Sequence, residues 1–121
     1  MTNRMLTDQE RDLVHWMLES GSPDAKGYLW QVDLLEVSPW KCQCGCASLK
    51  FEMKGYSSPK GGLRPLAEYV FGSRDECSGI FIYMVESRLG GIEVYGLTGQ
   101  ASQALPEITD LVPWEEWSAR R

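Results

Sequence analysis

The apolar residues of the N-terminal region recur at the spacing of an α-helix. Between residues 6 and 21, five apolar side chains fall on one broad face: Leu13, Val14, Trp16, Met17 and Leu18. Thr7 and Glu10 are three residues apart, which is the spacing of a capping box at a helix start. Gly21 is a natural helix end. The pattern therefore predicts a helix over Leu6–Gly21.

A second, shorter helix is predicted directly after the first. Serine commonly caps a helix start and proline suits the first helical position, and Ser22 and Pro23 follow each other in that order. We expect this helix to run from Pro23 to about Gln31, with Gly27 weakening its middle.

After residue 31 the helical spacing gives way to the two-residue alternation of β-strands. In residues 47–54, Leu49, Phe51 and Met53 alternate with polar residues, which predicts a half-buried strand. Residues 79–86 are apolar on both faces and predict a central strand. Residues 32–37, 66–72 and 92–97 are the other predicted strands, and residues 55–65 are a predicted loop rich in Gly, Pro and Ser.

Two helices followed by closely spaced strands predict an α+β fold. The short connection between residues 86 and 92 favours an antiparallel hairpin. We therefore expect two N-terminal helices packed on an antiparallel sheet of about four or five strands. A chain of 121 residues suits a single domain, residues 1–121.

The composition is that of a globular protein with a buried core, since 43% of the residues are hydrophobic and 24% are charged. The longest apolar run, Ile80–Val85, is too short to span a bilayer. Residues 1–12 contain charged residues from Arg4 onward and lack the apolar core of a secretory signal. We therefore expect a cytoplasmic protein that does not bind membranes and keeps its thiols reduced.

The uneven charge distribution indicates either a solvated acidic face or a surface that attracts a basic protein partner. The net charge of −5 argues against a nucleic-acid partner. Residues 89–119 contain five carboxylates and no basic residue, and residues 105–117 add tryptophans to them. Aromatic anchors with a charged rim are typical of protein interfaces, although the same segment could instead pack its apolar residues on the sheet. The predicted partner-binding residues are Glu107, Asp110, Trp114, Glu115, Glu116 and Trp117.

Three of the four cysteines, Cys42, Cys44 and Cys46, occupy alternate positions. Zinc sites usually pair cysteines two residues apart, and on a straight strand alternate residues lie about 7 Å apart, too far for one ion. A bend at Gly45 would close that gap, with Cys77 as a distant fourth ligand. Metal binding by Cys42, Cys44 and Cys46 and a turn that merely contains cysteines both remain open.

No catalytic set is recognisable. A nucleophilic cysteine needs a base, and the only histidine, His15, falls on the polar face of the first helix. The glycine pairs belong to no phosphate-binding motif. We therefore expect no enzymatic activity and no cofactor, with zinc as the single alternative.

Three stretches, KCQCGCASLKF (residues 41–51), GGIEVYGLTG (90–99) and LPEITDLVPW (105–114), resemble a group of small uncharacterised bacterial proteins. That group carries a CxCGC stretch, an EVYxLxG stretch and a terminal LP…L…W. The resemblance implies a bacterial cytoplasmic origin, and Cys77 has no counterpart in the pattern. In type alone, a small acidic domain without catalytic residues is also similar to the immunity proteins of toxin systems.

These observations lead to two functional expectations. The first is a non-enzymatic protein-binding module, specifically a cytoplasmic immunity protein that neutralises a basic toxin domain, because an acidic surface speeds the capture of a basic partner. The second is a metal-binding or redox-responsive protein that uses the three clustered cysteines. The sequence does not determine the oligomeric state.

Overall fold

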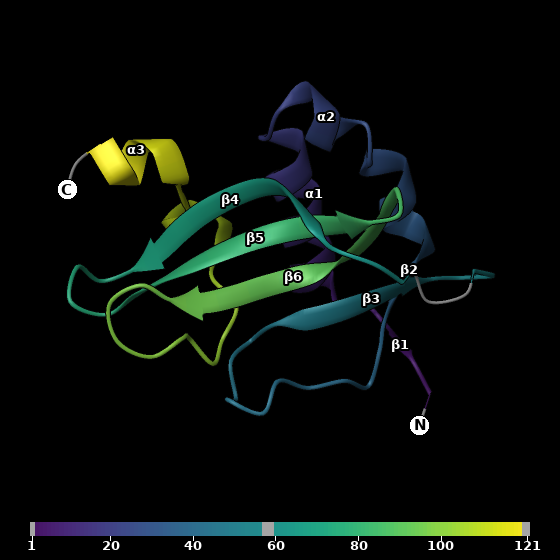
Figure 1. The fold of residues 1–121 in the computed structure, drawn as a ribbon, viewed down its shortest axis with the longest axis horizontal. Coiled ribbons are helices and arrows are strands. Elements are labelled where there is room, and N and C mark those ends of the chain that lie inside the picture. The colour runs from purple at the N-terminus through teal and green to yellow at the C-terminus, as the bar shows by residue number, and fades with distance from the viewer. Residues whose placement is uncertain (1, 57–59, 120–121) are drawn as a thin grey trace.

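A computed structural model describes residues 2–56 and 60–119 and shows an α+β fold (Figure 1). Within these residues the strands form one antiparallel sheet of seven strands in the order β1-β2-β3-β6-β5-β4-β7. The expected fold class is confirmed, whereas the expected number of strands, four or five, is too low. The two outermost strands have only two residues each, too few to show a periodicity.

The elements follow one another in a simple order along the chain. They are β1 (Arg4–Met5), α1 (Asp8–Glu19), α2 (Pro23–Lys26), the 3-10 helix η1 (Leu29–Leu34), β2 (Leu35–Val37), β3 (Leu49–Met53), β4 (Arg64–Gly72), β5 (Cys77–Val85), β6 (Arg88–Gly96), the 3-10 helix η2 (Ile108–Asp110), β7 (Val112–Pro113) and α3 (Trp114–Ala119).

The first helix forms as predicted. The Glu10 amide donates to Oγ1 of Thr7 at 3.1 Å, and the Thr7 amide donates to the Glu10 carboxylate at 2.9 Å, so the capping box is complete. Four residues of the predicted apolar face are fully buried: Leu13, Val14, Met17 and Leu18. Burial of this face against the sheet holds α1 in place.

The second helix is shorter than expected. It ends at Lys26 instead of Gln31, and η1 occupies residues that the alternation assigned to the end of this helix and to a strand at 32–37. The strand therefore starts only at Leu35. Gly27 ends the helix, and the buried Gln31 side chain is held by the β5–β6 hairpin through Ser87 and Leu89, which fixes the path of η1.

The strands β4, β5 and β6 form a long antiparallel meander in the centre of the sheet, each nine residues long. The hairpin between β5 and β6 turns at Glu86 and Ser87, which both have positive φ angles. The predicted loop at 55–65 includes residues 57–59, which lie outside the described residues. Its last two residues belong to β4, because Arg64 already pairs with Met84 across the sheet.

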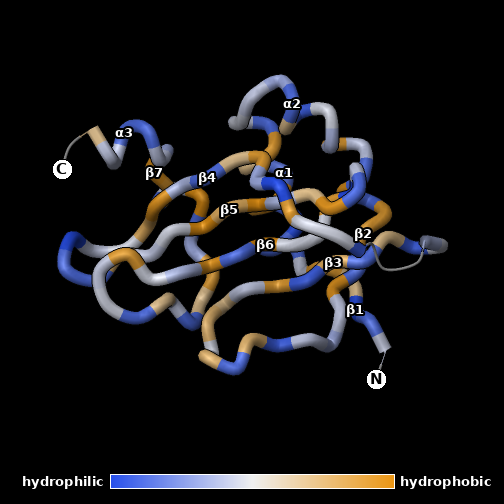
Figure 2. Tube along the Cα trace, in the orientation of Figure 1, coloured by the Kyte–Doolittle hydropathy of each residue, from blue (hydrophilic) through white to orange (hydrophobic). Residues whose placement is uncertain are grey.

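The helix α1 covers one face of the sheet (Figure 1). The Tyr69 hydroxyl donates to the carbonyl of Met17 at 3.0 Å, which ties β4 to the helix. The core lies between them, and Figure 2 shows mostly hydrophobic residues along β5 and a mixture of hydrophobic and polar residues along β4 and β6. The opposite face of β4, β5 and β6 is not covered by α1. No helix among residues 2–56 and 60–119 combines the length and apolar character needed to cross a bilayer.

Candidate metal site at residues 42–46

The chain turns sharply between Cys42 and Cys46. The Gly45 amide donates to the Cys42 carbonyl at 3.1 Å, which closes a tight turn. Gly45 has φ +83°, a backbone conformation that residues with a β-carbon rarely adopt. The Ala47 amide then donates to the Ser102 carbonyl at 3.0 Å and anchors the end of the turn. The segment is therefore a bent loop and not an extension of β3.

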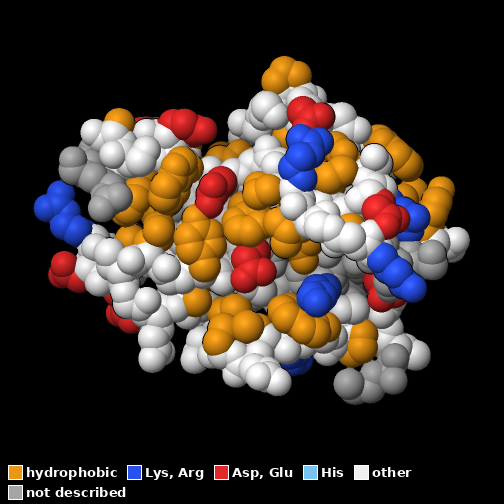
Figure 3. Space-filling view, in the orientation of Figure 1, with side chains coloured by type: hydrophobic (Ala, Val, Ile, Leu, Met, Phe, Trp, Pro, Cys, Tyr) orange, Lys and Arg blue, Asp and Glu red, His pale blue; other side chains and the backbone are white. Residues whose placement is uncertain are grey.

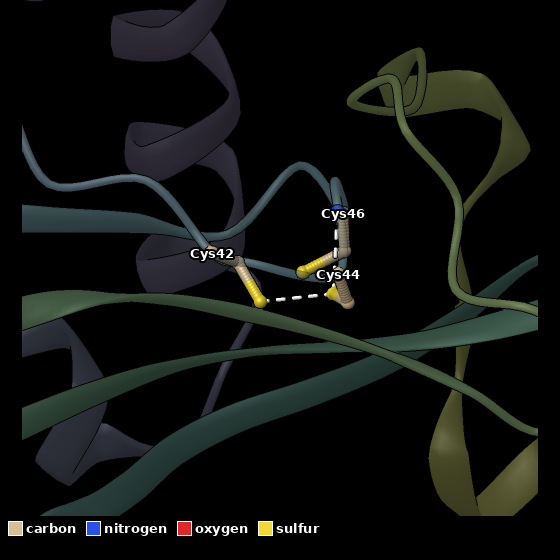
Figure 4. Close-up of side chains that lie close together, drawn as sticks. All are labelled: Cys42, Cys44 and Cys46. Carbon is tan, nitrogen blue, oxygen red and sulfur yellow. Dashed lines mark hydrogen bonds between the residues drawn. The ribbon is translucent and has the colours of Figure 1, made fainter.

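The bend brings the three sulfur atoms together (Figure 4). The Sγ atoms of Cys42, Cys44 and Cys46 all lie within 4.8 Å of one another, and those of Cys42 and Cys44 are 2.8 Å apart. Three thiolates on one tetrahedral zinc ion, with Zn–S bonds near 2.3 Å, have sulfurs roughly 3.8 Å apart. The observed separations, 2.8 Å for one pair and no more than 4.8 Å for the others, are close to this value, so the three sulfurs lie near enough to share one ion.

The thiols of Cys44 and Cys46 differ in acidity. Hydrogen bonds with the Cys42 and Cys46 thiols raise the pKa of Cys44 to about 11. Burial raises the pKa of Cys46, but hydrogen bonds from the hydroxyl and the amide of Ser48, together with those from Cys44 and Cys42, lower it overall. The Ser48 hydroxyl lies 3.2 Å from Sγ of Cys46. A metal ion binds thiolates, so Cys46 becomes a ligand more readily than Cys44.

A cleft of about 550 Å³ opens beside the loop. Cys42, Gly45 and Cys46 form part of its wall, and Gln103 approaches Gly45 from the segment after β6. Arg4 and Glu10, paired at 2.8 Å, form another part. The cysteine loop therefore borders a space that a small ligand or a partner side chain can enter.

The other two residues weighed as ligands or catalysts lie elsewhere. Cys77 is buried at the start of β5, with its sulfur 3.3 Å from the Thr98 hydroxyl, and is not part of the cysteine cluster. His15 is exposed on α1, 3.1 Å from the Glu19 carboxylate. Neither residue is grouped with the three clustered sulfurs among the described residues.

The predicted partner-binding residues are spread over two parts of the C-terminal segment. Trp114 and Trp117 lie together on α3, with ring centroids 5.4 Å apart and both side chains half-buried. Glu115 and Glu116 on the same helix are exposed. Glu107 lies elsewhere, in a cleft of about 440 Å³ that it shares with residues of α1. Asp110 is exposed at the end of η2.

Two residues that shape the cysteine loop were not predicted from the sequence. Ser48 is buried and contacts Cys46, and Gln103 approaches Gly45 from a distant part of the chain. A serine two residues after a cysteine is a local signal that was available. No local signal connects Gln103 to the loop, because the contact depends on the path of residues 97–105.

A scan against protein-family models and searches of curated proteins and of solved structures found no match.

Proposed function

We propose that the Cys42–Cys46 loop binds a zinc ion through three thiolates. The observation that carries this proposal is the mutual approach of the three Sγ atoms to within 4.8 Å. Three thiolates favour soft or borderline metals such as Zn²⁺ over Mg²⁺ or Ca²⁺. A tetrahedral ion held by three cysteines keeps a fourth position for water, a small ligand or a side chain from a partner.

Metal analysis of natively purified protein tests the zinc site. We expect about one equivalent of zinc per chain and loss of that zinc in a Cys44→Ser variant. Cys77→Ser is the matched control, because it removes the one cysteine outside the cluster and leaves the zinc content unchanged. Cobalt added to the metal-free protein should produce the absorption bands of a tetrahedral thiolate complex. Zinc far below one equivalent, together with no cobalt bands, would refute the proposal.

Mass spectrometry separates zinc binding from the redox-responsive alternative. In that alternative, Cys42 and Cys44, whose sulfurs are 2.8 Å apart, lose two protons and two electrons to a small disulfide oxidant and become joined. Mass spectrometry of the untreated protein then finds two hydrogens fewer and no metal. Reduced thiols and bound zinc support the metal site instead.

The C-terminal segment supports a second candidate function, that of a non-enzymatic protein-binding module. The supporting observation is the half-buried pair Trp114 and Trp117 next to the exposed carboxylates Glu115 and Glu116. Aromatic side chains next to negatively charged carboxylates are suited to bind a basic partner. The specific proposal is an immunity protein of a bacterial cytoplasm that neutralises a basic toxin domain, in keeping with the net charge of −5.

Coexpression with a toxin domain encoded beside this chain tests the second candidate. We expect cells to survive when the wild-type chain is present and to die with a Trp114→Ala/Glu115→Gln variant. An Asp8→Asn/Arg11→Ala variant of α1, also exposed, is the control that should still protect. Killing of cells that contain the folded wild-type chain would exclude the immunity function and leave the zinc proposal untouched.

A further inference from the structure

The face of the sheet opposite α1 carries a continuous row of aromatic rings. Side chains alternate along β5, and Ile80 and Ile82 are buried in the core against α1, so Phe81 and Tyr83 point to the other face. The Phe81 ring lies 6.0 Å from the Tyr83 ring and 6.0 Å from the Tyr95 ring. Phe81 and Tyr95 are half-buried and Tyr83 is more deeply covered.

Glycines opposite the tyrosines let these rings lie flat on the strands. Tyr95 pairs with Gly79 across the sheet, and a β-carbon at Gly79 would overlap the Tyr95 ring. Tyr83 pairs with Gly91 in the same way, and a β-carbon there would lie 2.9 Å from Cζ of Tyr83. The row is therefore built by cross-strand glycine–tyrosine pairs.

Two carboxylates flank the central ring in one register row. Glu68 pairs with Phe81 across β4 and β5, and Phe81 pairs with Glu93 across β5 and β6. Since neighbouring strands are about 4.8 Å apart, the two glutamate backbones are about 10 Å apart with Phe81 between them. Figure 3 shows acidic side chains set within the hydrophobic side chains over β4, β5 and β6.

The two tyrosines of this row are neutral. The Tyr95 hydroxyl donates to the Glu68 carboxylate, and burial together with this hydrogen bond raises the pKa of Tyr95. Burial and the nearby Glu93 carboxylate raise the pKa of Tyr83, so both tyrosines stay neutral. No hydrogen bond or ion pair to the Glu93 side chain is found within the part of the chain that the structure describes. Lys50 of β3 lines the same cleft as Glu93, and its ammonium group lies over the Trp40 ring at 4.6 Å.

We propose that the Glu68–Phe81–Glu93 row is a docking site for an arginine or lysine side chain of a basic partner protein. A guanidinium or ammonium group above the Phe81 ring gains a cation–π contact and lies between two carboxylates. Charge complementarity selects this occupant. Aromatic rings on a sheet face can also stack nucleic-acid bases, but Glu68 and Glu93 repel the phosphates.

This site shares no residue with the cysteine loop or with the C-terminal segment. The inference therefore goes beyond both functions proposed above, and its test requires neither zinc nor a toxin domain.

Titration with a short cationic peptide tests the site. The probe is the acetylated and amidated peptide Gly-Arg-Gly-Arg-Gly, added at low ionic strength and followed by NMR of the aromatic side chains. We expect saturable shifts at the Phe81 and Tyr95 rings, and none with the peptide in which glutamine replaces arginine. A Glu68→Gln/Glu93→Gln variant should bind about tenfold more weakly, the sum of two modest charge pairs. After Glu68→Gln, the side-chain carbonyl can still accept a hydrogen bond from the Tyr95 hydroxyl, which preserves the fold.

A matched variant separates this site from a general attraction to an acidic protein. Asp8→Asn/Asp12→Asn removes two exposed carboxylates of α1, on the other side of the sheet, and should change the affinity by less than about twofold. Phe81→Leu keeps the face apolar and should weaken binding through the lost cation–π contact. Equal losses in both carboxylate variants would refute the site, as would shifts confined to residues outside the row. Tighter binding of single-stranded oligouridine than of the arginine peptide would also overturn the proposal.

Discussion

The Ser48 hydroxyl accepts a hydrogen bond from the Val94 amide at 2.8 Å and continues the pairing of β3 with β6 beyond Leu49. The same hydroxyl lies 3.3 Å from the Val94 carbonyl and 3.2 Å from Sγ of Cys46. Ser48 is only 5% exposed. One buried side chain therefore links the cysteine loop to the centre of the sheet.

Replacing Ser48 by alanine should weaken both the fold and the metal site. The Val94 amide would be left buried without its acceptor, which costs about 1–3 kcal/mol of the free energy of unfolding. Cys46 would also lose a hydrogen bond that favours its thiolate, so zinc affinity should fall. Urea denaturation measures the first effect, and competition with a chelator measures the second. Ser118→Ala, on exposed α3, should change the stability by less than about 0.5 kcal/mol.

We predict that the buried Gln31 side chain stabilises the β5–β6 hairpin. Its carboxamide donates to the Ser87 carbonyl at 2.9 Å and accepts from the Leu89 amide at 2.8 Å. Gln31→Leu leaves the buried Leu89 amide unpaired and should lower the free energy of unfolding by about 1–3 kcal/mol. Faster hydrogen exchange at the Leu89 amide would accompany the loss. Unchanged exchange there, or an equal loss of stability in the exposed control Gln100→Leu, would contradict this role.

The prediction from sequence succeeded where a local signal matches the final packing. The capping box at Thr7 and Glu10 and the alternation of Leu49, Phe51 and Met53 both correspond to real elements. Residues 29–34 were misassigned because their conformation depends on a contact between Gln31 and a hairpin more than fifty residues away. Tertiary contacts of this kind override local propensity.

The backbone conformation of the cysteine loop could not be predicted from the sequence. Spacing alone left a straight strand and a bend at Gly45 as alternatives, and the structure has the bend. The aromatic row was missed for a related reason. Glu68, Phe81 and Glu93 come from three strands, so only the register of the sheet reveals that they form one row.

Gly79 should not tolerate a side chain. A β-carbon at this position would lie 2.6 Å from Cε1 of Tyr95, so Gly79→Ala must displace the ring from the sheet face. Overpacking of this kind typically costs about 1–3 kcal/mol. Thermal unfolding measures the loss, and NMR of the Tyr95 ring detects its displacement. Gly62→Ala is the control, since a β-carbon there meets nothing within 4 Å. Equal stability of the two variants would show that the ring does not lie on Gly79.

Stability should fall at acidic pH partly through Glu10. The Arg4 hydrogen bond, opposed by burial, keeps the pKa of Glu10 below its ordinary value. A carboxylate with a lowered pKa in the folded state stabilises the fold above its unfolded pKa, about 4.3. That contribution disappears as the pH falls through the lower folded pKa. Urea denaturation from neutral pH to about pH 3 should therefore show a steeper loss in wild type than in Glu10→Gln. Glu76→Gln, an exposed control, should follow the wild-type curve.

Alkylation of the metal-free protein should reveal the order of thiol acidity in the cysteine loop. Cys44 is the most exposed of the three, yet hydrogen bonds with its neighbours raise its pKa to about 11, whereas the pKa of Cys46 is lowered. Iodoacetamide reacts with the thiolate, so the cysteine with the larger thiolate fraction reacts faster. The lower intrinsic nucleophilicity of the more acidic thiol offsets part of this difference in rate. We therefore expect Cys46 to react at least about tenfold faster than Cys44 near neutral pH.

Peptide mass spectrometry at short reaction times measures these rates, with the buried Cys77 as the internal marker of unfolding. Ser48→Ala should slow the reaction at Cys46 specifically, because the variant loses the hydroxyl that stabilises this thiolate. Added zinc should protect all three loop cysteines together, since one ion binds all three sulfurs. Faster reaction at Cys44 than at Cys46 would contradict the acidity order. Protection of only one cysteine by zinc would contradict a shared site.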